Sequence, residues 1–142
     1  MKKNITAYAL SYGLWILSIG LGLLAAMIVR ETVIFALISS EANRYGIHLG
    51  TQVITILLGI VLLITIVVLE NRYREGLAKR RTFGYFLRFL GIVLLVMAVT
   101  HIWYVAVGLS LGPLDLFRFV AALAEVGLGL LSLRLARRRF AR

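Results

Sequence analysis

Four long apolar runs constrain this chain more than any other feature. They lie at residues 5–29, 52–69, 83–107 and 116–133. An α-helix needs about 20 apolar residues to cross the hydrocarbon core of a membrane, and each run is close to that length or exceeds it. Together the runs predict an all-α, single-domain protein in which four transmembrane helices form a bundle.

The composition supports this fold class and argues against a soluble protein. Hydrophobic residues make up 61% of the 142 residues and charged residues 15%, whereas soluble domains have about 45–50% and about 25%. A soluble domain of this size buries only roughly 70% of its chain surface and could not hide so much apolar area. A water-soluble enzyme or a free nucleic-acid-binding protein is therefore not expected. The absence of cysteine excludes disulfides, thiolate metal sites and cysteine nucleophiles.

The boundaries of the runs carry further information. The first run lacks the short apolar core and the A-x-A-like cleavage site of a signal peptide, so it predicts a retained helix. A Gly- and Pro-containing stretch before the fourth run predicts an antiparallel hairpin of the last two helices, with Asp115 as the N-cap. Residues 31–40 are too short to span. They either continue the first helix beyond the bilayer or form an interfacial helix.

Charge predicts the orientation of the helices. The termini and the segment between the second and third runs hold twelve of the sixteen basic residues, and the opposite side holds two, Arg30 and Arg44. This positive-inside pattern predicts that both termini lie in the cytoplasm. The twelve are Lys2, Lys3, Arg72, Arg74, Lys79, Arg80, Arg81, Arg134, Arg137, Arg138, Arg139 and Arg142.

Ionisable residues inside the apolar runs are the candidate site. Glu125 lies near the centre of the fourth run, where an ionised carboxylate is costly unless it is paired or hydrated, and Arg118 lies two turns away on the same side. His101 of the third run lies within about one turn of the depth of Glu125 if the two helices are antiparallel. The three residues predict either a proton, cation or ligand site, or a polar contact that fixes helix packing.

The two histidines make tetrapyrrole binding a second alternative. His101, alone or with His48, is a candidate axial ligand to haem or chlorophyll, although His48 lies at or outside the outer interface. No other cofactor and no metal site is expected. Trp15, Trp103 and most tyrosines are expected to be interface anchors.

The C-terminal tail predicts contact with lipid. Anionic headgroups attract basic residues beside a span, each contributing roughly 1 kcal/mol. Nucleic acid is not an expected partner, because the topology accounts for the charge. The expected headgroup contacts are Arg134, Arg137, Arg138, Arg139 and Arg142.

Small residues share the face of Glu125 on the fourth run at helical spacing and predict a close helix contact. They are Ala121, Ala122, Gly129 and Ser132. The chain has no G-x-S-x-G, no H-E-x-x-H and no phosphate-binding glycine loop. Catalysis is therefore not expected.

Several short motifs lie at the ends of the predicted helices or within the last two of them. They are Arg30-Glu31-Thr32-Val33, Pro113-Leu114-Asp115, Phe83-Gly84-Tyr85-Phe86 with Gly91, Ala121-Ala122 and the basic tail. Together they resemble the phosphate-starvation-inducible PsiE family of small bacterial membrane proteins, and this resemblance implies a bacterial inner membrane. The sequence departs from that family by a longer stretch before Pro113 and by Glu125. The resemblance implies a role in the response to phosphate shortage and assigns Glu31 and Asp115 to an outer-face acidic pair.

These observations leave three functional hypotheses. The first is a non-enzymatic accessory or regulatory subunit that acts through lipid, a second copy or a larger membrane complex. The second is an oligomeric proton-coupled carrier that uses Glu125 and His101. The third is a haem- or chlorophyll-binding subunit of an electron-transfer complex.

Overall fold

The fold is a set of four long helices, seen in a computed structural model that describes residues 2–40, 43–78, 81–108 and 113–140. The helices are α1 (Lys2–Ser39), α2 (Arg44–Ala78), α3 (Thr82–Gly108) and α4 (Pro113–Phe140). Each is long and apolar enough to cross a membrane. The predicted all-α architecture with four candidate spans is confirmed.

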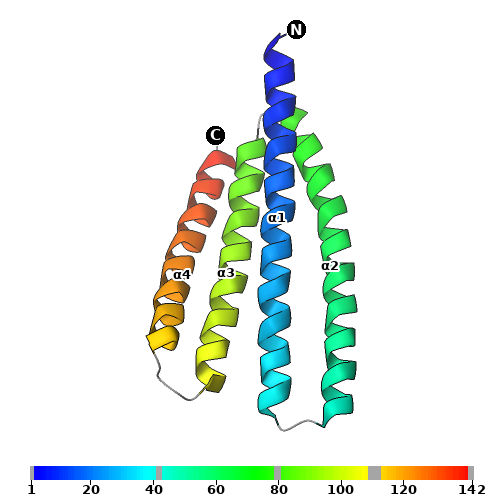
Figure 1. The fold of residues 1–142 in the computed structure, drawn as a ribbon. Helices are drawn as coiled ribbons and strands as arrows, with labels where there is room; N and C mark the ends of the chain where they lie inside the picture. Colours follow the sequence, from blue (N-terminus) through cyan, green and yellow to red (C-terminus); the bar gives the residue numbers. More distant parts are fainter. Residues whose placement is uncertain (1, 41–42, 79–80, 109–112, 141–142) are drawn as a thin grey trace.

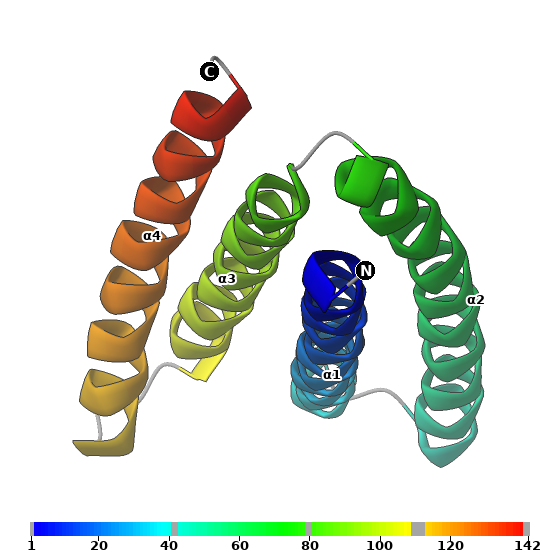
Figure 2. The same cartoon turned by 90° about the horizontal axis from the view of Figure 1, so that it is seen from above.

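The helices form an open layer in the spatial order α4, α3, α1, α2 (Figures 1 and 2). The α3–α4 pair shares the most extensive interface, and α1 packs against both α2 and α3. Within the described residues, α4 contacts neither α1 nor α2. The start of α1, the end of α2, the start of α3 and the end of α4 lie at one end of the layer, and the other helix ends lie at the opposite end (Figure 1).

The helix bounds refine the sequence analysis. Residues 31–39 are not a separate element but the last turns of α1. Asp115 was predicted to be an N-cap, and this was wrong: α4 begins two residues earlier at Pro113, whose fixed φ suits the first helical position. At the start of α2, the Gly46 N–H donates to Asn43 Oδ1 at 2.7 Å, which identifies Asn43 as the N-cap.

A small apolar core joins α1, α2 and α3 near the end that carries the termini. Leu69, Tyr73 and Phe86 are buried at its centre. Leu14, Trp15, Leu21, Phe89 and Leu90 pack around them. This core packs α1 against both α2 and α3.

Small residues hold α3 and α4 together. A Cβ added to Gly91 would lie 2.9 Å from the Gly129 carbonyl oxygen, and one added to Gly129 would lie 3.2 Å from the Gly91 oxygen. Ala98 and Ala122 are almost completely buried beside them. Ala122, Gly129 and Ser132 are buried, so the close contact predicted for this face of α4 is confirmed.

Hydroxyl groups along the helices satisfy their hydrogen-bonding needs locally. Thr32, Thr51 and Thr65 each donate to the carbonyl oxygen four residues earlier, at 2.7–2.9 Å. A hydrocarbon environment offers no water for such groups, and this bond allows them to lie within an apolar helix.

Candidate functional site

His101 of α3 and Glu125 of α4 meet across the α3–α4 seam. His101 Nδ1 lies 2.9 Å from Glu125 Oε2, and the side chains are 22% and 14% exposed. The antiparallel packing of α3 and α4 through Gly91 and Gly129 brings the two residues to the same level.

This contact can hold one proton in two ways. An Nδ1–H donates to an ionised carboxylate, or a protonated carboxyl donates to a neutral Nδ1. Glu125 lies about 18 Å from the start of α4, in the middle of that helix. The pair is therefore a proton-holding group far from either end of the helix.

Arg118 extends the polar seam by an aromatic contact. Its guanidinium lies 3.9 Å from the centre of the Tyr104 ring, and Tyr104 stacks on Phe35 of α1 with ring centres 4.3 Å apart. Tyr104 is one helical turn beyond His101. Arg118, Tyr104, His101 and Glu125 thus follow the same seam between α3 and α4.

The other predicted site residues are not brought together by the described part of the chain. Glu31 is exposed on α1, and its neighbour Arg30 donates through Nε to Thr55 Oγ1 at 3.0 Å. Asp115 lies in the first turn of α4, but its side chain is outside the described residues. The acidic pair therefore stays a prediction.

The histidines lie on different helices. His48 of α2 is 3.2 Å from Gln52 through its Nε2. His101 directs Nδ1 to Glu125. Nε2 is therefore the nitrogen through which His101 would bind the metal of a tetrapyrrole as an axial ligand. Among the described residues no three His, Asp or Glu side chains form a metal-binding group. Tetrapyrrole binding stays a prediction.

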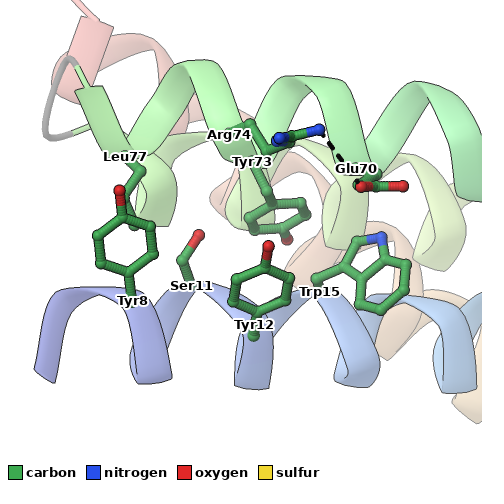
Figure 3. Close-up of a pocket in the computed structure, with 8 residues that line it drawn as sticks. All are labelled: Tyr8, Ser11, Tyr12, Trp15, Glu70, Tyr73, Arg74 and Leu77. Carbon is green, nitrogen blue, oxygen red and sulfur yellow. Dashed lines mark ion pairs between the residues drawn. The ribbon is translucent and has the colours of Figure 1, made fainter. Parts of the chain in front are cut away.

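A second site, which the sequence did not indicate, lies between α1 and α2 (Figure 3). It is a cavity of about 200 Å³ with the Glu70–Arg74 ion pair, at 3.7 Å, on one side. The residues that line it are Tyr8, Ser11, Tyr12, Trp15, Glu70, Tyr73, Arg74 and Leu77. The aromatic walls and the ion pair make this cavity amphipathic.

One buried donor in this cavity is unpaired. Trp15 Nε1 has no hydrogen-bond partner among the described residues. Figure 3 shows the indole nitrogen on the side of the ring nearest Glu70. An N–H without an acceptor is a costly feature of a buried site, and a bound acceptor would remove that cost.

Tyr73 beside this cavity belongs to the core. Its hydroxyl lies 2.8 Å from Ser18 Oγ, and Ser18 is fully buried. Tyr73 is therefore an exception among the tyrosines, most of which are expected to be interface anchors, because it is buried. A tyrosine four residues past the end of the second apolar run gives no sequence signal that a serine on another helix will pair with it.

Comparisons with known proteins give no family. No family model, no curated protein and no solved structure matches this chain. The resemblance to the PsiE family rests on the quoted motifs and stays a prediction.

The structure describes part of the basic tail. Arg134, Arg137 and Arg138 are exposed on the last turns of α4. The side chain of Arg139 and the whole of Arg142 lie outside the described residues. The exposed arginines lie at the end of the molecule that carries both termini (Figure 1).

Proposed function

We propose that this chain is a non-enzymatic, multi-pass protein of a bacterial cytoplasmic membrane. In this proposal it is an accessory or regulatory subunit that acts through a second copy, other membrane subunits or lipid. Both termini lie in the cytoplasm, because most basic residues flank the end that carries them. The association with phosphate shortage rests on the PsiE resemblance alone.

One observation carries this proposal: the His101–Glu125 pair is partly exposed at the edge of an open helix layer. Ionisable groups that face lipid are costly, whereas a protein surface can cover and hydrogen-bond them. Leu128 is three residues after Glu125 and lies on the same side of α4. We infer that a second copy of the chain covers this side.

A cross-linking experiment tests the inference. Because the chain has no cysteine, Leu128→Cys introduces a single reactive site beside the pair. Oxidation in native membranes is expected to give a disulfide-linked dimer. Leu130→Cys is the matched control, since Leu130 is 56% exposed and Leu128 55%, but Leu130 points to another side of α4.

The outcome discriminates between the hypotheses. A cross-link to a protein of different mass would show that another subunit, and not a second copy of the chain, covers this side of α4. Equal dimer formation by Leu128→Cys and Leu130→Cys would contradict a specific assembly on this side of α4. The absence of any dimer, together with a monomeric mass in a lipid nanodisc, would also contradict it.

The hydrogen bond itself favours a second candidate, a proton-coupled carrier built from two or more copies. Its support is the 2.9 Å contact between two titratable groups within the candidate spans. In proteoliposomes that contain a pH-sensitive dye, Glu125→Gln is expected to abolish substrate-dependent proton flux. Glu75→Gln, which removes an exposed carboxylate of α2, serves as the control. Unchanged flux in Glu125→Gln would remove Glu125 from the mechanism.

A further inference from the structure

Arg88 of α3 stands between two open cavities. One cavity, of about 530 Å³, lies between α2 and α3 and also contains Arg72. The other, of about 480 Å³, lies between α3 and α4 and also contains Arg137. Arg88 and Ile92 line both. Three arginines, one each from α2, α3 and α4, therefore line these two cavities.

Little negative charge opposes these arginines in the described part of the chain. Arg72 lies 3.8 Å from Glu75, with both side chains more than half exposed, and such an exposed pair contributes little. No described carboxylate lies within ion-pair distance of Arg88 or Arg137. The guanidinium groups are thus available to an anion.

The cavity beside Arg72 continues into an apolar groove. Phe89 and Ile92 line both that cavity and a further one of about 250 Å³, which lies over α1 between α2 and α3. Ala26, Leu58 and Val96 are among the residues that line this groove. The hydroxyl of Thr65, also in the groove, donates to the Val61 carbonyl and needs no other partner. The cavity lined by Arg72 and Arg88 therefore adjoins an apolar groove.

We propose that this face binds a phospholipid with two phosphate groups and four acyl chains. One phosphate lies between Arg72 and Arg88, the other lies between Arg88 and Arg137, and an acyl chain occupies the apolar groove. Arginine binds phosphate oxygens bidentately, and basic pockets between transmembrane helices on the cytoplasmic side suit such headgroups. This site is independent of the assembly proposed for the Glu125 side of α4.

The apolar groove decides between a lipid and a free anion. A soluble phosphate or diphosphate could contact the arginines but would leave the groove empty. A phospholipid occupies both the cavities lined by arginines and the apolar groove, because its headgroup is covalently joined to its acyl chains. Inorganic diphosphate is therefore expected not to compete with the lipid.

Native mass spectrometry of the full chain tests the site. The protein is titrated in mild detergent with a four-chain diphosphatidylglycerol and with phosphatidylglycerol at equal phosphate concentration. We expect the four-chain lipid to bind at least about fivefold more tightly per phosphate, because one additional arginine contact is worth roughly 1 kcal/mol. Arg88→Gln is expected to remove that preference.

Two further variants make the result specific. Arg44→Gln removes the same charge from an exposed position of α2 that lines none of the three cavities, and it is expected to keep the preference. Ala26→Leu replaces a methyl group by an isobutyl group in the groove and is expected to weaken lipid binding without a change of charge. An equal loss of the preference in Arg88→Gln and Arg44→Gln would overturn the proposal. Displacement of the lipid by inorganic diphosphate would also overturn it.

Discussion

At the scale of single residues, two buried or partly buried pairs of polar side chains connect neighbouring helices. His101 pairs with Glu125 across α3 and α4, and Ser18 pairs with Tyr73 across α1 and α2. The sequence pointed to the first pair because both residues are anomalous in apolar runs. It gave no sign of the second, because serine and tyrosine are common in such runs and only the packing shows that they meet.

Removing one partner of the His101–Glu125 pair is expected to cost more than removing both. Glu125→Ala leaves a partly buried imidazole without its partner, with an expected loss of about 1–3 kcal/mol in the free energy of unfolding. Glu125→Gln keeps an acceptor and loses less. The measurement is reversible denaturation in detergent micelles. A double-mutant cycle with His101→Ala that gives no coupling would contradict the hydrogen bond.

The Ser18–Tyr73 pair gives an asymmetric prediction. In Tyr73→Phe, Ser18 still donates to the Leu14 carbonyl at 2.8 Å, so the expected loss is only about 0.5–1.5 kcal/mol. Ser18→Ala leaves a buried tyrosine hydroxyl without its partner and is expected to destabilise more. Tyr8→Phe, at an exposed position, is the control in the same unfolding assay. The reverse order of the two variants would refute the assignment.

At the scale of helices, close approach depends on two glycines. Gly91→Ala places a methyl group against the Gly129 carbonyl and Leu133, and it is expected to separate α3 from α4 with a loss of about 1–3 kcal/mol. Gly127→Ala is the matched control, since a Cβ there meets nothing within 4 Å. That variant is expected to be neutral or stabilising by up to about 1 kcal/mol, because alanine favours helix.

Unfolding of these two glycine variants in micelles distinguishes packing from propensity. A pure propensity effect would stabilise both variants. Equal stabilisation of Gly91→Ala and Gly127→Ala would therefore contradict the close α3–α4 contact. The sequence identified the small-residue face on α4, and the structure added the matching glycine on α3.

At the scale of the whole molecule, the termini and the α2–α3 connection share one end (Figure 1). With the positive-inside pattern, this arrangement predicts that the α1–α2 connection faces outward. In intact cells, Asn43→Cys is expected to react with a membrane-impermeant maleimide, whereas Glu75→Cys is expected to react only after permeabilisation. Labelling of Glu75→Cys in intact cells would reverse the proposed orientation.

The sequence by itself determined the four helices, their antiparallel order and the sidedness of their charge. These properties depend on the length of apolar runs and on where charges interrupt them, both of which are local. Only the tertiary structure decided that Arg88 lies between two cavities. It also decided that, among the described residues, α4 packs on α3 alone and the buried Trp15 N–H has no acceptor. Those features depend on how helix faces are rotated against one another. An apolar helix that is hydrophobic on every side gives little sequence signal for that rotation, so side-chain packing sets it.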